Sequence, residues 1–245
     1  MMNGKVKVRD YFDRNAEVYD LKHGVSRPGQ RHNFTRYYEP FLNEAIRPGA
    51  SVLELGCGTG LYSRWLLDRG CTVVGMDISP TMLEQARRRC PEATFVVGDC
   101  ETPASHLPEP LVSGRFDVIL GVNTFCYYPN KDAALAHYRH LLRPGGRIVL
   151  IEVNGRCPYW RMMTWINKNE IRAWCGEFRR LDRNSMQAML QHAELKARTI
   201  THFAFIPNGV GRVAVAVLKP LDAVLRRLPI LRNLAMRLAV VAENV

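Results

Sequence analysis

The segment 54–60, with the sequence ELGCGTG, has the residue types and spacing best suited to ligand chemistry in this chain. Glycines at positions 56, 58 and 60 permit a tight turn and let the backbone approach a ligand closely. Dinucleotide-binding loops have GxGxxG spacing, and Leu61 stands here where their third glycine would be. The carboxylate of Glu54 suits a cationic group, such as an α-amine, better than a phosphate. The loop therefore predicts a ligand site that does not fit a nicotinamide dinucleotide.

Short apolar runs alternate with amphipathic segments on both sides of this loop. Runs rich in β-branched residues predict strands over residues 51–55, 72–76, 94–97, 116–120 and 147–153. Helical patterns cover residues 61–68, 80–89 and 131–142. This alternation predicts an α/β fold, a Rossmann-like doubly wound sheet whose strands are mostly parallel.

The two flanks of the chain follow other patterns. The first fifty residues are helical and aromatic. After residue 153 come an aromatic-rich helical stretch, a helix over 184–191 and a sixth strand over 196–205. Residues 207–233 form two basic amphipathic pieces, which we expect to break at Pro220 and Pro229. A seventh strand is predicted over 238–242. Both flanks can close over the carboxyl edge of the sheet, where such folds bind ligands.

The run VLELGCGTG resembles the first motif of the class I S-adenosylmethionine-dependent methyltransferases. The resemblance extends over residues 52–152. It implies that Asp77 holds the ribose hydroxyls of S-adenosylmethionine and that Asp99 accepts a hydrogen bond from the adenine amino group. FDVILGVN resembles the fourth-strand motif of this family, and LLRPGGRIVLIE resembles its run into the fifth strand. S-adenosylmethionine is thus the implied cofactor, and S-adenosylhomocysteine the product.

The layout of the whole chain is similar to the small-molecule branch related to quinone-biosynthesis C-methylases, of methyltransferase type 11. The opening YFDRNAEVYD resembles the N-terminal lid of that branch, although ordinary helix packing explains its two tyrosines equally well. The implied cofactor-binding residues lie on the lid, in the glycine loop and after the strands: Tyr11, Tyr19, Glu54, Gly56, Cys57, Gly58, Gly60, Asp77, Ile78, Asp99, Cys100 and Asn123.

The resemblance divides the chain into three parts. Residues 1–50 form a helical lid, and residues 51–153 form the core that binds S-adenosylmethionine. Residues 154–245 supply a cap, the remaining strands and a basic helical insertion of the same domain. The end of the chain, LAVVAENV, fits an antiparallel strand at the edge of the sheet.

The segment 123–128, NTFCYY, follows the fourth strand and is the expected wall of the acceptor pocket. Nucleic-acid amino-methyltransferases of this fold carry an Asn/Asp-Pro-Pro-aromatic tetrad there, and its absence argues against methylation of a nucleobase amine. His23 and Tyr127 are the candidate catalytic residues, with a solvated loop histidine as the alternative for His23. The histidine and cysteine spacings suit no metal, so we expect no metal site.

An aromatic cluster after the fifth strand bears on the acceptor. Trp160, Met162, Met163, Trp165 and Trp174 form either an apolar lid over the acceptor or a buried helix face. The first interpretation favours a small hydrophobic or aromatic biosynthetic acceptor, methylated at an O, N or C atom. Alternative functions are an RNA-directed methyltransferase and a non-catalytic module that binds the cofactor.

The net charge of +11 is concentrated near the end of the chain. Residues 151–245 carry fifteen Lys and Arg against seven Asp and Glu, whereas residues 51–150 are balanced. A solvated basic face, an anionic substrate, a membrane surface and RNA are all compatible with this asymmetry. We expect nucleic acid not to be the partner. Residues 219–233 can lie on an anionic membrane surface or pack on their own domain.

Cysteine usage and the N-terminus bear on the compartment. Seven scattered cysteines with no CxxC pair predict neither a disulfide framework nor a zinc site. The sequence MMNGKVKVRD has no apolar signal region. We therefore expect a cytoplasmic monomer or homodimer, with peripheral membrane contact as an open alternative.

Overall fold

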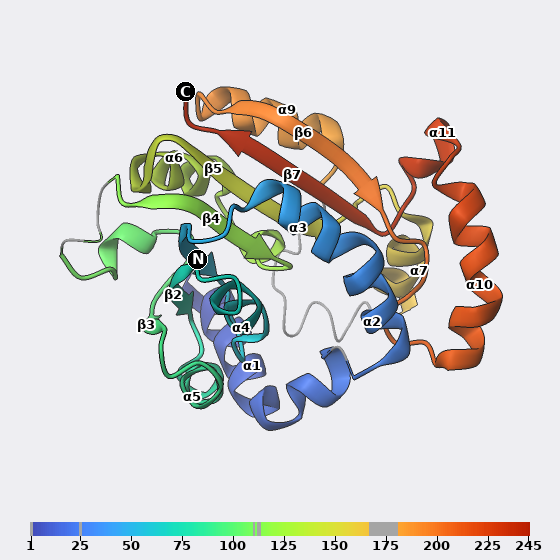
Figure 1. Ribbon diagram of the computed structural model, residues 1–245, viewed down its shortest axis with the longest axis horizontal. Coiled ribbons are helices and arrows are strands. Elements are labelled where there is room, and N and C mark those ends of the chain that lie inside the picture. The colour runs from blue at the N-terminus through green and yellow to red at the C-terminus, as the bar shows by residue number, and fades with distance from the viewer. Residues whose placement is uncertain (1, 25, 110, 112–113, 167–180) are drawn as a thin grey trace.

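The computed structural model describes residues 2–24, 26–109, 111, 114–166 and 181–245 (Figure 1). The strands of this part are β1 (Ser51–Leu55), β2 (Thr72–Asp77), β3 (Thr94–Val97), β4 (Phe116–Val122), β5 (Leu142–Val153), β6 (Lys196–Phe203) and β7 (Arg237–Glu243). Its α-helices are α1 (Met2–His23), α2 (Pro28–Asn33), α3 (Glu39–Ala45), α4 (Leu61–Leu67), α5 (Pro80–Arg89), α6 (Lys131–Leu141), α7 (Pro158–Ile166), α9 (Arg183–His192), α10 (Arg212–Leu225) and α11 (Pro229–Arg232). Short helical segments of other types are η1 (Phe34–Tyr38), η2 (Pro103–Ser105) and η3 (Phe125–Tyr127).

Within the described residues, one sheet holds all seven strands in the order β3-β2-β1-β4-β5-β7-β6. The first five are parallel to one another, and β7 is antiparallel to both of its neighbours. The order reverses at β1, where the chain winds to β2 and β3 on one side and to β4 and β5 on the other. The predicted doubly wound, mostly parallel sheet with an antiparallel last strand is confirmed.

The place of the last strand differs from the prediction. We expected β7 at the sheet edge, but it pairs with β5 on one side and with β6 on the other. The run Leu238–Ala242 is apolar and buried throughout, so it needs partners on both edges. β6 takes the edge instead, where its exposed Lys196 and Arg198 are solvated and discourage pairing with another chain.

The predicted helix break at Pro220 is also wrong, because α10 continues through that residue. Proline removes one backbone hydrogen bond from a helix interior. Pro220 is exposed, and the carbonyl freed by its missing N–H can therefore be hydrated. Pro229 does mark a break, since α10 ends at Leu225 and α11 begins at Pro229.

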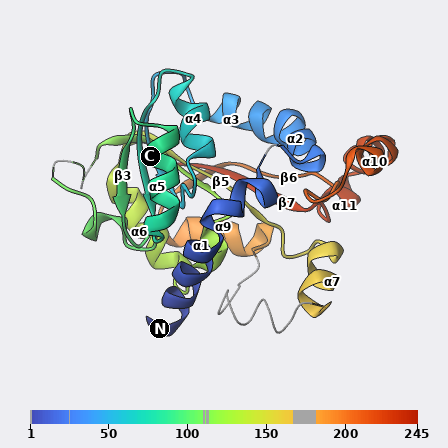
Figure 2. The same ribbon diagram turned by 90° about the horizontal axis from the view of Figure 1, so that it is seen from below.

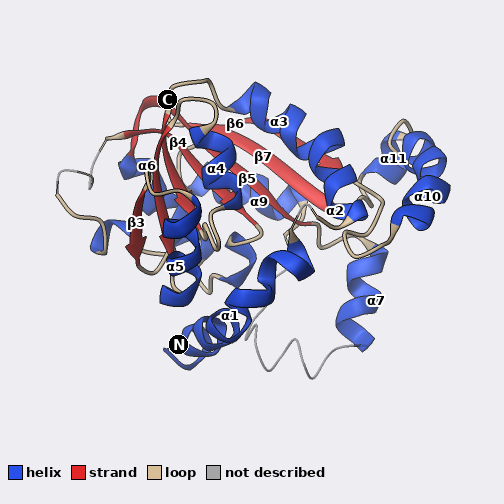
Figure 3. Cartoon of the chain, turned by 60° about the horizontal axis from the view of Figure 1, so that its bottom comes forward, coloured by secondary structure: helices blue, strands red, loops and turns tan. Residues whose placement is uncertain are grey.

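Apolar side chains cover both faces of the sheet. One layer joins Leu53, Ile119 and Leu150 to α6 and α9, and the other joins strand residues to α3 and α4. The helix α1 lies apart from these layers and packs against α5 (Figures 1 and 3). The lid predicted over residues 1–50 therefore contains both α1 and α3, of which α3 belongs to the packed core.

The strand register fixes the position of the functional edge. Leu55 of β1 lies opposite Met76 of β2 and Gly121 of β4. Because these strands are parallel, the residues that follow them come together at one carboxyl edge. No helix in the described ranges is both long and apolar enough to cross a bilayer.

Candidate cofactor and acceptor site

A cavity opens at this carboxyl edge, between the glycine loop, the strand ends and α1. It brings together many of the predicted site residues, namely Tyr19, Gly56, Gly58, Asp77, Ile78, Asp99, Cys100, Asn123 and Tyr127. Tyr11, Glu54, Cys57 and Gly60 do not line it. His23 ends α1, and its side chain lies outside the described part of the structure.

The glycine loop needs glycine for two separate reasons. Gly56, Gly58 and Gly60 all have positive φ angles, of 64°, 53° and 78°. A Cβ at Gly56 would also lie 2.4 Å from Oγ1 of Thr124. At Gly58 the same atom would meet nothing within 4 Å, so the backbone is open there. The loop thus offers bare backbone to a ligand in the cavity.

Asp77 is held rigidly at the end of β2. Its carboxylate accepts hydrogen bonds from the backbone N–H groups of Gly58 and Ser79, both at 2.9 Å. Burial raises the pKa of Asp77, and the two backbone donors oppose that shift. Each oxygen of the carboxylate keeps accepting capacity beyond these bonds. Asp77 can therefore receive hydroxyl groups of a ligand without moving.

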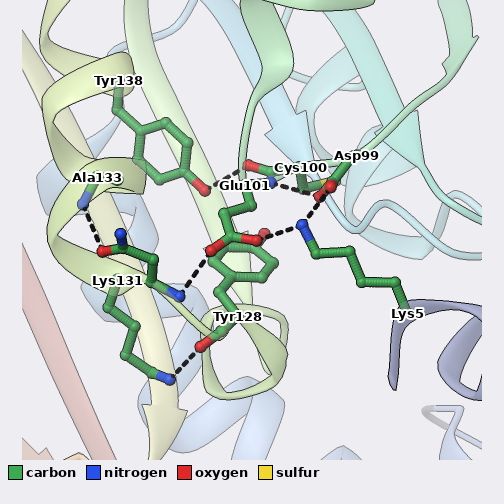
Figure 4. Close-up of polar contacts among 9 residues, drawn as sticks. Lys5, Asp99, Cys100, Glu101, Tyr128, Lys131, Ala133 and Tyr138 are labelled. Carbon is green, nitrogen blue, oxygen red and sulfur yellow. Dashed lines mark hydrogen bonds and ion pairs between the residues drawn. The ribbon is translucent and has the colours of Figure 1, made fainter. Parts of the chain in front are cut away.

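Lys5 of α1 reaches the end of β3, where its ammonium pairs with both Asp99 and Glu101 (Figure 4). Burial disfavours the charged ammonium, but the two carboxylates outweigh that effect and raise the pKa of Lys5. Glu101 also accepts a hydrogen bond from the backbone N–H of Asn130 at 2.6 Å. Sequence reasoning identified Asp99 but not Lys5 or Glu101.

Further polar contacts hold α1 against the core. Asp13 accepts hydrogen bonds from the Ser79 hydroxyl and, at 3.4 Å, from the Thr81 N–H. Asp20 pairs with Arg89 and accepts a hydrogen bond from the Thr59 hydroxyl at 2.6 Å. These contacts and the Lys5 pair join α1 to segments that follow β1, β2 and β3. The helix is thus fastened over the cavity by half-buried polar groups.

The contacts of Asp20 give a direct prediction for the closure of α1. Asp20→Asn removes the charge that faces Arg89, which is worth about 1 kcal/mol for a half-exposed pair. The amides of α1 should then exchange hydrogen roughly fivefold faster, while the amides of β1 and β4 stay unchanged. Hydrogen exchange measured by mass spectrometry tests this. Asp10→Asn is the matched control, because Asp10 is exposed on the same helix and contacts its neighbour Arg9. Equal exchange in the two variants would contradict the role of Asp20.

Glu54 lies beneath the glycine loop and is 3% exposed. Its carboxyl group accepts a hydrogen bond from the Ser63 hydroxyl. Burial raises the pKa of Glu54 to about 8, the Ser63 bond opposes this, and the negative charge of Asp77 adds to it. Near neutral pH this carboxyl is therefore largely protonated. A cation placed near it would favour the ionised form and so lower its pKa.

The turn for which the sequence predicts the acceptor wall begins at Asn123, a non-glycine residue with φ of 55°. The next backbone N–H groups, those of Thr124, Phe125 and Cys126, all donate to the buried Glu152. Burial raises the pKa of Glu152 to about 7, and these donors oppose the shift. The β4–η3 turn is therefore shaped by a single carboxyl group from β5.

Arg237, at the start of β7, contacts a residue of the cavity wall from behind, and sequence reasoning missed it. It is 4% exposed, and its guanidinium donates to Oδ1 of Asn123 at 2.7 Å. The same guanidinium lies over the ring of Trp160, 5.4 Å from its centroid. Because β7 is antiparallel, its first residue lies at the carboxyl edge of the parallel strands. A buried positive charge thus lies behind Asn123, which lines the cavity.

The predicted aromatic cluster does not form a single buried face. Trp160 is half-buried and donates a hydrogen bond to the Met236 carbonyl at 3.1 Å. Trp165 and Met162 are exposed, which contradicts the alternative of a wholly buried helix face. Trp174 lies outside the described residues. Whether the cluster covers the acceptor therefore stays a prediction.

The polar groups that line the cavity fit S-adenosylmethionine. Open backbone at Gly58 suits close approach, and the carboxylates of Asp77 and Asp99 suit ribose hydroxyls and an adenine amino group. In the described ranges, no group of three or more His, Cys, Asp or Glu side chains is arranged to hold a metal ion. None of the cysteines that the structure describes is in a disulfide, and Cys57 and Cys100 are buried.

Comparison with known proteins identifies the type of domain to which this edge belongs. Residues 52–146 match the family model of methyltransferase domains. This stretch belongs to a methyltransferase domain. Demethylmenaquinone methyltransferase of Beutenbergia cavernae is 35% identical over 153 residues, which are 62% of this chain and 60% of that protein. Malonyl-[acyl-carrier protein] O-methyltransferase of Serratia marcescens is 34% identical over 147 residues, 59% of this chain and 52% of that protein.

The matched stretches span less than two thirds of these relatives, so the likeness describes the methyltransferase domain rather than the whole proteins. Among solved structures, geranyl diphosphate methyltransferase in complex with GPP and sinefungin superposes with a TM-score of 0.64. It covers 98% of this chain and 99% of that one at 16% identity, so it shows a shared fold. The methyltransferase domain therefore carries the class I fold that the sequence predicted.

Proposed function

We propose that this protein transfers a methyl group from S-adenosylmethionine to a small, hydrophobic or aromatic biosynthetic acceptor. One observation carries the proposal: a backbone-open glycine loop and the carboxylates of Asp77 and Asp99 line one cavity after adjacent strands. The names of the relatives, which act on a quinone precursor and a carrier-bound malonyl group, support a small acceptor.

The cofactor supplies the activated methyl group, so the protein needs mainly to orient both reactants and to exclude water. In this proposal Asp77 binds the ribose and Asp99 the adenine amino group, while the charge of Glu54 acts on the α-amine from beneath the glycine loop, outside the cavity wall. Tyr19 lines the cavity from α1, and α1 shields the reaction from solvent. The methyl acceptor would lie beside Asn123 and Tyr127, and the positive charge of Arg237 behind Asn123 favours negative charge that develops on an acceptor oxygen.

Transfer of labelled methyl from S-adenosylmethionine to a dihydroxynaphthalene, as a reduced-quinone probe, tests the reaction. The expected result is a methylated naphthol together with S-adenosylhomocysteine. Binding of S-adenosylhomocysteine without transfer to this probe, to phenols or to amines would overturn the acceptor class. Failure to bind S-adenosylhomocysteine would overturn the cofactor as well.

Tyr127 is the catalytic candidate that the cavity contains, and its ring meets Phe12 of α1 edge-on at 5.8 Å. If its hydroxyl takes or orients the acceptor proton, Tyr127→Phe should lower kcat by about a hundredfold or more. The affinity for S-adenosylhomocysteine should stay the same. Steady-state kinetics with the active probe give this result. A rise in KM alone would instead assign Tyr127 to the pocket wall.

His23, the last residue of α1, is the other proposed catalytic residue. A cytoplasmic location and a monomeric or homodimeric state also stay proposals. Sedimentation velocity of the purified protein would decide the oligomeric state.

A further inference from the structure

The helix α10 has one face docked on the protein. Val215 and Asp222 are its buried residues, and the helix packs against α2. The Asp222 carboxylate accepts hydrogen bonds from the hydroxyl of Tyr37 and, at 2.9 Å, from the backbone N–H of Phe205. These contacts come from η1 and from the segment after β6, so they fix the rotation of α10 about its own axis.

The opposite face of α10 is apolar and open to solvent. Val213 is 80% exposed, Val217 70%, Leu221 52% and Val224 56%. Their spacing of four, four and three residues places them in one row along the helix. Leu228 and Ile230 continue the exposed apolar surface into α11, where Ile230 is 82% exposed. We call these six residues the α10 stripe. A row of this kind is unusual for a surface that faces only water.

The charges around the α10 stripe have one sign. Arg212, Lys219, Arg227 and Arg232 are exposed between residues 212 and 232. Asp222, the acidic residue of this segment, is buried on the docked face. An apolar row with basic residues alone beside it is typical of helices that lie in the interface of an anionic bilayer. Two copies of this face would instead bring like charges together.

A second helix adds to the same end of the molecule. Figure 2 shows α7, α10 and α11 gathered at one end, away from α5 and β3, and Figures 1 and 3 agree. On α7, Trp165 is 80% exposed, and Met162 and Ile166 are also exposed. Tryptophan favours the boundary between water and lipid, because its ring is apolar and its N–H is polar.

We propose that the α10 stripe, with the exposed side of α7, docks on the surface of an anionic lipid bilayer. The helix would lie in the plane of the interface, with its apolar row among the upper acyl chains and its basic residues against the headgroups. This inference goes beyond the proposed methyl transfer and does not depend on it. A bilayer would also hold apolar acceptors at high local concentration beside the protein.

Flotation of the purified full chain with lipid vesicles tests the proposal. Vesicles of phosphatidylcholine and phosphatidylglycerol should bind the protein, and vesicles of phosphatidylcholine alone should bind it far less. The double variant Lys219→Gln, Arg227→Gln should weaken binding roughly thirtyfold, since each basic residue near an anionic surface contributes about a factor of five. Val217→Ser, Leu221→Ser should weaken it at least about tenfold on the same vesicles.

Matched controls lie on other faces of the molecule. Arg87→Gln, Arg88→Gln removes two exposed charges from α5, and Val97→Ser removes an exposed apolar side chain from β3. Both should bind anionic vesicles like the unmodified protein, and thermal melts should show every variant folded. Equal loss in controls and α10 variants would contradict the proposal. The proposal would also be contradicted if the protein did not bind vesicles and formed a dimer that Val217→Ser, Leu221→Ser dissociates. That result would assign the α10 stripe to contact with a second copy of this chain.

Discussion

Asp77→Asn is expected to weaken the binding of S-adenosylhomocysteine by about a hundredfold to ten-thousandfold. The carboxylate already accepts hydrogen bonds from the N–H groups of Gly58 and Ser79. In our proposal it also accepts hydrogen bonds from two ribose hydroxyls. An amide carries a donor in place of one accepting oxygen, so it cannot satisfy all of these partners. Each hydrogen bond to a charged group contributes roughly 1.5–3 kcal/mol, and two such losses give the stated range.

Isothermal titration calorimetry of each variant with S-adenosylhomocysteine measures this effect. Asp68→Asn is the matched control, because Asp68 is an exposed carboxylate on the C-terminal side of α4 and pairs with Arg64. A melt without ligand checks that the Asp77 variant is folded. An affinity within threefold of the unmodified protein would show that Asp77 does not hold the ribose.

Glu54 is expected to make cofactor binding depend strongly on pH. Its pKa is about 8 without ligand, so at pH 7 the carboxyl is mostly protonated. A cationic α-amine held above it by the glycine loop favours the ionised form of Glu54 and lowers its pKa on binding. Binding then releases a proton, and affinity should fall about tenfold for each pH unit below 8 until the pKa of the complex is reached. Above pH 8 this dependence disappears.

Calorimetry in two buffers with different ionisation enthalpies counts the released proton. At pH 7 we expect nearly one proton for the unmodified protein and none for Glu54→Gln, whose affinity should be weak and independent of pH. Glu92→Gln is a control, since Glu92 is exposed and pairs with Arg64 away from the cavity. Proton release that persists in Glu54→Gln would assign the titration to another group.

The parts of the site that were predicted from the sequence depend on short stretches of neighbouring residues. The glycine loop, Asp77 and Asp99 each follow a predicted strand directly, and parallel strands place such residues at one edge whatever the loops between them do. The helix boundaries of α5 agree with the predicted range because Ser79 caps its first turn and Pro80 follows. Short-range patterns were sufficient for these features.

The residues that sequence reasoning missed reach the site across long separations. Lys5 meets Asp99, which lies 94 residues away, and Arg237 meets Asn123, 114 residues away. Neither basic residue stands in a motif, so their pairing depends on how α1 and β7 pack. The position of β7 inside the sheet also depends on packing between distant segments. Its unbroken apolar run was nevertheless a signal against an edge strand.

A thermal melt with S-adenosylhomocysteine, with NAD as control, tests the central claim most directly. Ligand at about a hundred times its Kd should add about 2.7 kcal/mol to the free energy of unfolding. For a chain of 245 residues this raises Tm by roughly 5–10 °C. We expect that rise with S-adenosylhomocysteine and none with NAD. No rise, or a rise with NAD alone, would contradict it.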